Sequence, residues 1–216
     1  MTVCDSLIIL HYTKIKDSAI VIHTLSRRWG RRSFLVHLGK GQSLALFQTL
    51  SIVQADITEN PRSELWKAGK FVAEHPLIGL RQDFHKNTIA MFMGEVLYRT
   101  ITDGACEEGL FDWCRKSIMT LDAMDCDFAN FHLRWLLEFC SALGFAPSRE
   151  DIAPFAGEYF SAISSLLSSS FGEAMLLPLN GKERNGICDM LIRYVSHHTE
   201  ISLDIRSLRV LRELFS

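Results

Sequence analysis

Hydrophobic and polar positions alternate along the first part of the chain. The alternation covers Ser6–Tyr12, Ser18–Ser26 and Phe34–Leu38, which are rich in β-branched and aromatic residues. A period of two is typical of strands with one buried face. Two further runs, Leu44–Ile57 and Glu64–Val72, complete a set of five predicted strands. Five short strands in succession predict a small closed barrel of the OB type, although an SH3-like barrel fits the pattern almost as well.

The period changes to helical spacing after Pro76. Apolar residues then recur every three or four positions, which predicts amphipathic helices. The helical segments are Ile89–Ile101, Leu110–Leu121, Phe128–Leu143, Ser161–Ser170, Glu183–Val195 and Asp204–Phe215. The predicted fold class is therefore α+β, with a five-stranded OB-type β-barrel over residues 1–78 and an α-helical domain over residues 79–216.

The distribution of charge changes this picture more than its total does. The chain has 216 residues, 48% of them hydrophobic and 22% charged, which excludes a largely disordered protein. Its net charge is only −2, but residues 1–80 hold ten Lys and Arg against six Asp and Glu, and residues 81–216 hold thirteen against nineteen. A basic N-terminal part suits a polyanionic partner, although chance scatter of surface charge gives an asymmetry of this size too.

The corner Arg27–Arg32, which reads Arg-Arg-Trp-Gly-Arg-Arg, is the strongest candidate for binding chemistry. It joins the second and third predicted strands, and Thr13–Asp17 is expected to form the turn between the first two. Guanidinium groups bind phosphates and an indole can stack on a base, but an Arg-rich loop is also found as plain solvated surface. The predicted DNA-binding residues, with the lysines placed in neighbouring turns, are Lys14, Lys16, Arg27, Arg28, Trp29, Arg31, Arg32 and Lys40.

No catalytic or metal-binding constellation is visible in the sequence. The segment Gly39–Ser43 lacks the spacing of a Walker loop, and no nucleophile elbow, zinc-protease helix or kinase signature occurs. The histidines His11, His23 and His37 match no metal-ligand template. We therefore expect no enzyme activity, no catalytic residues, no metal and no cofactor.

The cysteines and the chain start bear on the cellular compartment. Six cysteines stand without close pairs, several of them on apolar helix faces, which predicts reduced structural thiols. No apolar stretch reaches membrane-spanning length, and the N-terminus lacks the features of a secretory signal. The expected location is the cytoplasm, with no membrane partner.

One predicted helix carries an aromatic stripe of Phe128, Phe131, Trp135 and Phe139. Core packing is the favoured interpretation. The alternative is that part of the stripe, rimmed by basic residues, forms a groove for an apolar, acidic peptide. The residues proposed for this groove are Arg99, Arg115, Lys116, Arg134 and Trp135.

Softer motifs follow one another in a fixed order along nearly the whole chain. They are Ile8–His11, a strand ending in Thr24, the corner Arg28–Arg31, Lys40–Gly41, Glu95–Arg99, Leu110–Asp112, Phe131–Leu133 and Leu143–Pro147. Their order and spacing resemble the RecO family of bacterial recombination mediators. The earlier motifs are similar to its N-terminal OB domain and the later ones to its helical domain.

The resemblance implies an OB barrel joined to a helical domain. It also implies a non-enzymatic role in recombinational repair: binding of single- and double-stranded DNA, annealing of complementary strands, and help in replacing single-stranded-DNA-binding protein with recombinase. The partners it implies are RecR and the C-terminal tail of single-stranded-DNA-binding protein. That tail is acidic and ends in an apolar residue, so it suits the groove described above.

One departure from the family pattern concerns zinc. Many members carry a four-cysteine zinc module shortly after the Gly-x-x-Pro corner, whereas here Pro147 is followed by Ser148–Pro154 without a cysteine pair. Only Cys188 lies downstream of Cys140. We expect the zinc module to be absent.

The sequence leaves two hypotheses of different classes. In the first, the barrel binds DNA and the helical domain binds proteins. In the second, the chain is an adaptor whose barrel binds a protein partner instead of DNA.

Overall fold

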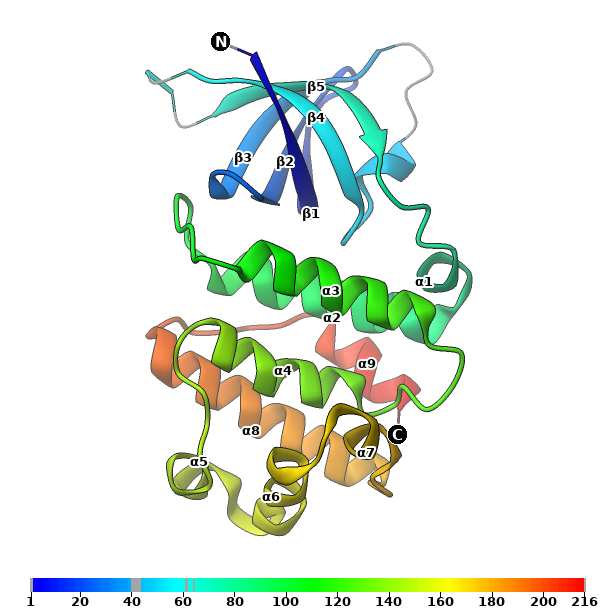
Figure 1. Cartoon of the computed structure of the whole chain (residues 1–216), viewed down its shortest axis with the longest axis vertical. Coiled ribbons are helices and arrows are strands. Elements are labelled where there is room, and N and C mark those ends of the chain that lie inside the picture. The colour runs from blue at the N-terminus through cyan, green and yellow to red at the C-terminus, as the bar shows by residue number, and fades with distance from the viewer. Residues whose placement is uncertain (1, 40–43, 61, 64, 216) are drawn as a thin grey trace. The chain divides into compact units, whose positions relative to one another are not determined.

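The computed structural model describes residues 2–39, 44–60, 62–63 and 65–215. They form an N-terminal five-stranded barrel followed by helices (Figure 1), so the predicted α+β fold class is confirmed. The chain divides into two compact units: residues 1–78 with 94–119 form unit 1, and residues 79–93 with 120–216 form unit 2. The functional division at residue 78 remains a prediction.

The barrel in unit 1 has the strand order of an OB fold. Its strands are β1 (Thr2–Lys16), β2 (Ala19–Ser26), β3 (Gly30–His37), β4 (Ile52–Thr58) and β5 (Trp66–Ala73). They close in the order β1-β2-β3-β5-β4, with β3 and β5 parallel and the other pairs antiparallel. Full closure leaves few unpaired strand edges. Of the two barrels that the pattern allowed, the chain adopts the OB type.

Two strand predictions need correction. The polar segment Thr13–Asp17 is mostly strand, because β1 continues through Lys16 in antiparallel register with β2, and only residues 17–18 form the turn. The run Leu44–Ile57 is not one strand but a short 3-10 helix, Leu44–Phe47, followed by β4. Leu50 lies between them with a positive φ of 61°, which is outside the region of regular β-strands. An apolar run alone did not reveal this break, because buried strands and buried turns are equally hydrophobic.

Alternate side chains of the strands fill the barrel. Its core includes Leu7, Ile9, Ile22 and Phe34, each with no exposed surface, and Phe47 joins them from the 3-10 helix. In β2 and β3 the alternating apolar positions point to the buried face, as a two-residue period requires. In β1 the residues Leu7 to Leu10 are all buried, so the period there does not separate two faces.

All six predicted helical segments contain helices, and three short helices were not predicted. The helices are α1 (Ile78–Gln82), α2 (Phe84–Thr100), α3 (Leu110–Ala123), α4 (Phe131–Ala142), α5 (Arg149–Ala156), α6 (Phe160–Ser168), α7 (Phe171–Leu176), α8 (Gly181–Thr199) and α9 (Leu208–Leu214). The missed ones are α1, α5 and α7, each of at most eight residues, which is too short for a clear period.

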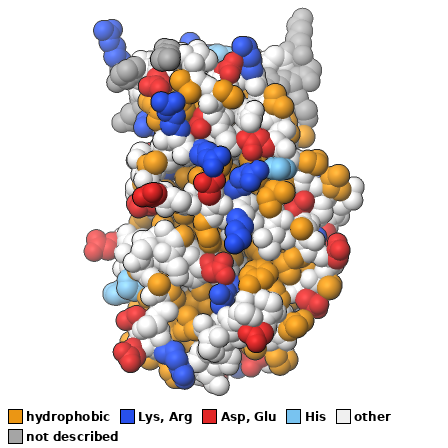
Figure 2. Space-filling view, viewed as in Figure 1, with side chains coloured by type: hydrophobic (Ala, Val, Ile, Leu, Met, Phe, Trp, Pro, Cys, Tyr) orange, Lys and Arg blue, Asp and Glu red, His pale blue; other side chains and the backbone are white. Residues whose placement is uncertain are grey.

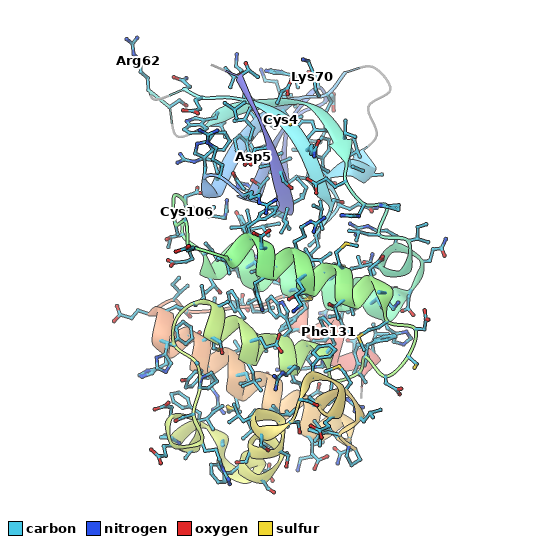
Figure 3. The ribbon with its side chains drawn as sticks, in the orientation of Figure 1. Cys4, Asp5, Arg62, Lys70, Cys106 and Phe131 are labelled. Carbon is cyan, nitrogen blue, oxygen red and sulfur yellow. The ribbon has the colours of Figure 1, made fainter. Side chains whose placement is uncertain are left out.

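In unit 2, helix α8 packs against α4 and α5. The aromatic stripe lies in this core: Phe131 and Trp135 are each 2% exposed and Phe139 is fully buried. Phe131 is labelled in Figure 3 on α4, among side chains of the helical part of the chain. Core packing is therefore confirmed as the role of these three residues. Helix α4 begins at Phe131, so Phe128 lies before the helix and not on it.

Candidate nucleic-acid interface

The β2–β3 corner is held by a short network of backbone and side-chain hydrogen bonds. The Ser26 hydroxyl donates to the buried Asp5 carboxylate and accepts from the Trp29 backbone N–H at 3.0 Å. Asp5 also accepts from the Arg28 backbone N–H at 3.3 Å. These bonds fix the turn, and they leave the Arg28 side chain exposed and the Trp29 side chain half-buried.

Gly30 ends the corner in a left-handed conformation, at a place where the neighbouring backbone leaves no room for a side chain. Its φ is +62°, and an added Cβ would lie 2.0 Å from the Ala105 carbonyl oxygen. The backbone on either side of that contact is bonded to the loop after α2: Arg31 N–H donates to Ala105 O at 2.8 Å, and Gly104 N–H donates to Arg31 O at 2.7 Å. The corner and residues 104–105 therefore form one rigid piece of unit 1.

Two arginines of the corner lie over indole rings. The Arg28 guanidinium carbon is 5.4 Å from the centre of the Trp29 ring, and that of Arg32 is 4.4 Å from the centre of the Trp66 ring. The two indoles meet edge to face, with ring centres 5.4 Å apart and an interplanar angle of 86°. We call Arg28, Trp29, Arg32 and Trp66 the indole–arginine array. Each cation over a ring contributes about 0.5–1 kcal/mol at an exposed site. Trp66 is buried in the barrel core, so the array offers a ligand the half-buried Trp29 ring and the positive charges of Arg28 and Arg32.

The other two arginines of the corner hold carboxylates of the same unit. Arg27 Nη2 donates to both carboxylate oxygens of Asp112, at 2.9 and 3.1 Å. The Arg31 side chain is only 5% exposed and pairs with Asp103 at 3.0 Å. Burial lowers the pKa of Arg31, and the charge of Asp103 partly opposes that shift. In this structure Arg31 supports the fold of the corner and does not face solvent.

Lys14 and Lys16, two of the lysines predicted to extend the basic track, do not join the corner. Lys14 and Lys16 lie at the β1–β2 end of strand β2, whereas the corner lies at its other end. The eight residues of β2 separate the two ends by about 25 Å. Lys14 forms an exposed ion pair with Asp17 at 2.8 Å. Consecutive hairpin turns fall on opposite ends of their shared strand, so the placement of these lysines in neighbouring turns was wrong; Lys40 lies outside the described residues.

Acidic side chains lie among the basic ones on the visible face of the barrel (Figure 2). Lys70, for example, pairs with Asp56 at 2.9 Å. Figure 3 shows Arg62 and Lys70 at the end of the barrel away from Cys106, which lies in the loop bonded to the corner. The array, and not one broad cationic surface, is what distinguishes the corner.

The residues predicted for a peptide groove are divided between the two units. Arg99, Arg115 and Lys116 belong to unit 1, and Arg134 and Trp135 belong to unit 2. Arg99 pairs with Glu95 on its own helix, at 2.9 Å. Arg134 donates to the Leu166 and Ser169 carbonyl oxygens at 3.1 and 2.9 Å, which caps the end of α6. Within unit 1, Arg115 lies 2.7 Å from His75 Nε2. The structure gives Arg134 and the buried Trp135 supporting roles within unit 2.

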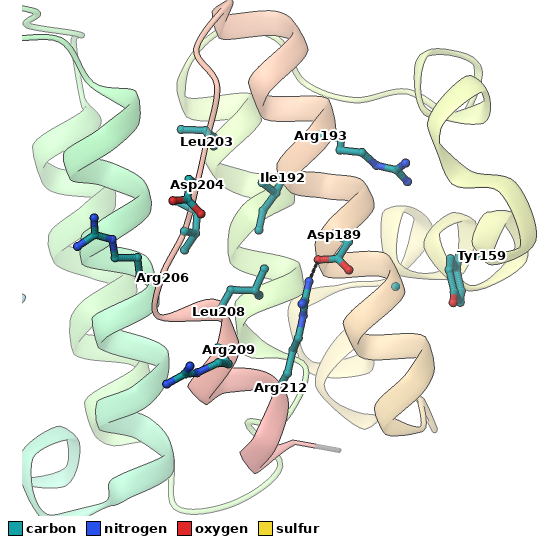
Figure 4. Close-up of a pocket in the computed structure, with 12 residues that line it drawn as sticks. Tyr159, Asp189, Ile192, Arg193, Leu203, Asp204, Arg206, Leu208, Arg209 and Arg212 are labelled. Carbon is teal, nitrogen blue, oxygen red and sulfur yellow. Dashed lines mark hydrogen bonds and ion pairs between the residues drawn. The ribbon is translucent and has the colours of Figure 1, made fainter.

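A different cleft in unit 2 has the chemistry expected of that groove. It has a volume of about 1000 Å³ and lies between α8 and the segment that leads into α9 (Figure 4). Apolar side chains of Ile192, Leu203 and Leu208 line it, and the exposed Arg193 and Arg209 stand at its margin. An ion pair between Arg212 and Asp189 spans it. We call this the α8–α9 cleft.

Sequence reasoning missed the partners that give the corner its geometry. Trp66 was assigned only to a strand, and Asp112 only to a helix. Asp112 is 85 positions from Arg27, so no local pattern could have paired them. For the cleft the sequence does contain a signal, because Arg206, Arg209 and Arg212 recur every three residues.

Metal-ligating groups do not gather among the described residues: no group of three His, Cys, Asp or Glu there could hold an ion. The six cysteines are free thiols, with Cys114, Cys140 and Cys188 buried. Burial raises the pKa of Cys140 to about 12, so this thiol stays protonated. In the part of the chain that the structure covers, no helix is long and apolar enough to span a membrane.

Fold and site together define a class of protein: an OB barrel with an arginine-rich corner, followed by helices. A family model described as Recombination protein O C terminal matches residues 81–153. A DNA repair protein RecO from Phocaeicola vulgatus is 30% identical, with 97% of this chain and 97% of the relative covered. Proteins of the same name from Bacteroides fragilis (96% and 97% covered) and Flavobacterium psychrophilum (100% of both) are each 27% identical. The chain belongs to the RecO family of DNA repair proteins.

Proposed function

We propose that the chain is a recombination mediator that binds single- and double-stranded DNA through the β2–β3 corner. In this role it anneals complementary strands and helps a recombinase replace single-stranded-DNA-binding protein. The observation that carries the proposal is the indole–arginine array, because planar rings with cations over them suit bases and phosphates at once. Membership of a family of DNA repair proteins supports it independently. Mediation requires no chemical step, which agrees with a site built only for binding.

The residues of the corner have two proposed roles, ligand contact and support of the fold, which their burial and ion pairs distinguish. Arg28 is exposed, Trp29 and Arg32 are half-buried, and neither arginine forms an ion pair with a described carboxylate. These three side chains are the proposed ligand contacts. Arg31 is assigned a supporting role because its side chain is buried against Asp103.

The test is a fluorescence-anisotropy titration of a labelled single-stranded oligonucleotide at low and moderate salt, repeated with a duplex of the same length. We expect binding at low salt that weakens steeply as salt rises, because bound phosphates release counterions. No binding at low salt would favour the adaptor hypothesis, in which the barrel binds a protein.

A second role, protein docking, is supported by the α8–α9 cleft. We propose that this cleft takes the acidic tail of single-stranded-DNA-binding protein, and that RecR is a further protein partner. The apolar side chains in the lining suit the terminal apolar side chain of such a tail. Four arginines line the cleft against the two carboxylates of Asp189 and Asp204, so the balance of charge suits an acidic tail. A labelled acidic peptide with an apolar C-terminal residue should bind, and the same peptide ending in Asp should not.

A further inference from the structure

The acidic loop between α2 and α3 lies against the basic corner. Residues 101–109 connect the two helices and include Asp103, Glu107 and Glu108, and Asp112 follows in the first turn of α3. Two backbone hydrogen bonds fasten this loop to the start of β3. Figure 3 shows Cys106 of this loop close to the end of the barrel where the β2–β3 corner lies. The segment that is bonded to the arginine-rich corner therefore carries four carboxylates.

Arg27 is the exposed arginine of the corner that does not belong to the array, and its guanidinium group is bound by Asp112. The Arg27 and Asp112 side chains are 57% and 60% exposed, so solvent and ligands reach both. The geometry is that of a carboxylate accepting two bonds from one guanidinium nitrogen. A phosphate offers the same oxygen arrangement and competes for the same donor.

We infer that the α2–α3 loop and the first turn of α3 act together as an electrostatic restraint on the corner, in which Asp112 of α3 pairs with Arg27 and lowers the affinity for a nucleic-acid backbone. The inference rests on the proposed function, since it concerns the same site. A phosphate can engage Arg27 only after Asp112 has released it. The neighbouring Glu107 and Glu108, both exposed, add repulsion toward the incoming strand.

The pairs in the corner differ in how easily they can be exchanged. In the Arg31–Asp103 pair the Arg31 side chain is buried and Asp103 is exposed, and the pair joins the corner to the loop. The Arg27–Asp112 pair is open to solvent on both sides, and exposed pairs of this kind contribute little to stability. Breaking it costs the fold little, and the exposed carboxylate remains available to return when the ligand leaves.

The experiment is a double-mutant cycle in the full chain, with wild type, Arg27→Ala, Asp112→Asn and the double variant titrated with a single-stranded oligonucleotide. We expect Asp112→Asn to bind about threefold to tenfold more tightly at low salt, and this gain to shrink as salt screens the charges. In the Arg27→Ala background the same substitution should give no gain, because the donor that it frees is missing. The matched control is Asp56→Asn, which removes an equal charge from the ion pair between the half-buried Asp56 and the exposed Lys70 elsewhere on the barrel.

Three outcomes would overturn the inference: unchanged affinity for Asp112→Asn, a gain equal to that of Asp56→Asn, or a gain that persists without Arg27. If wild type binds and loses affinity on Arg28→Ala, any of these outcomes removes the restraint while the proposed function stands. If wild type does not bind the oligonucleotide at low salt, the proposed function fails and the restraint with it. Thermal unfolding of each variant shows whether a loss of affinity reflects a loss of fold.

Discussion

The β2–β3 corner and the α8–α9 cleft both carry exposed arginines, but different groups lie next to those arginines. In the corner, Arg28 and Arg32 lie over indole rings. In the cleft, Arg193 and Arg209 stand at the margin of a floor that includes Leu208. Indole rings receive a planar base, whereas an aliphatic floor receives an apolar side chain. The neighbours of an arginine, more than the number of arginines, therefore determine which anionic ligand a surface selects.

Acid should destabilise both units through different histidines: burial lowers the pKa of His23 in the barrel to about 4, and His132 acts in the unit that carries the cleft. Burial, followed by the charge of Arg184, lowers the pKa of His132 to about 3, whereas an unfolded histidine titrates near its ordinary value of 6.5. The folded state therefore excludes a proton that the unfolded state takes up below pH 6.5. The stability that depends on neutral His132 is complete above that pH and falls by at most about 1.4 kcal/mol per pH unit toward pH 3.

The measurement is urea unfolding of wild type and His132→Leu between pH 7 and pH 4. The variant should lose less stability than wild type as the pH falls. The exposed His37→Leu serves as the matched control. Parallel loss of stability in wild type and His132→Leu would contradict the assignment of this acid sensitivity to His132.

Gly30→Ala should break the corner and leave the cleft intact. The positive φ and the backbone contact at 2.0 Å leave no room for a methyl group, and the nearest atoms are main-chain atoms that cannot rotate away. We expect a loss of about 2–4 kcal/mol in the unfolding free energy of the barrel. Gly69→Ala, where nothing lies within 4 Å of the added Cβ, is the control. Equal unfolding midpoints for the two variants would show that Gly30 is not needed.

Replacing Arg28 and Arg32 together with alanine should weaken oligonucleotide binding by about tenfold or more at low salt. The cause is the loss of two cations that lie beside the stacking surface. Peptide binding at the cleft should not change. Lys70→Ala with Lys182→Ala removes the same charge from other exposed ion pairs and is the control. A similar loss of affinity in this control would mean that net charge, and not the array, binds the strand.

Arg209→Glu should have the smallest effect, a threefold to tenfold weaker affinity for the acidic peptide. Arg209 is exposed at the margin of the cleft, so reversing its charge repels carboxylates without disturbing the core. Oligonucleotide binding should remain at the wild-type level, and Lys182→Glu is the matched charge reversal. The assignment of different ligands to the two surfaces is wrong if Arg209→Glu lowers the affinity for the oligonucleotide and leaves the affinity for the peptide unchanged.

The sequence allowed the prediction of the barrel because each strand has one buried face. The alternation at Ile20, Ile22, Phe34 and Val36 matches the observed core. In the first strand the pattern marked Ile8 and Leu10, whereas the barrel core holds Leu7 and Ile9. The long helices were predictable for a similar reason, since a full apolar stripe marks segments such as α8. Helix α5 was missed because it is short, polar and contains Pro154, so that its start is visible only as the capping box of Ser148 and Asp151.

The site was less predictable, because its geometry depends on contacts between distant residues. The corner could be recognised from its composition, but the burial of Arg31 follows from Asp103, which lies 72 positions away. The array needed Trp66, which parallel pairing of β3 and β5 brings beside Phe34. Local periodicity contains neither piece of information, since strand order is decided by the tertiary fold.

The most direct test of the account measures how salt changes the oligonucleotide affinity of wild type and of the Arg28→Ala, Arg32→Ala variant. Each phosphate contact on a single strand contributes about 0.7 to the slope of log affinity against log salt concentration. If both arginines hold phosphates, the slope of the variant should be shallower by about 1.4. An identical slope for the two proteins would show that these arginines touch no phosphate and would contradict the proposed interface.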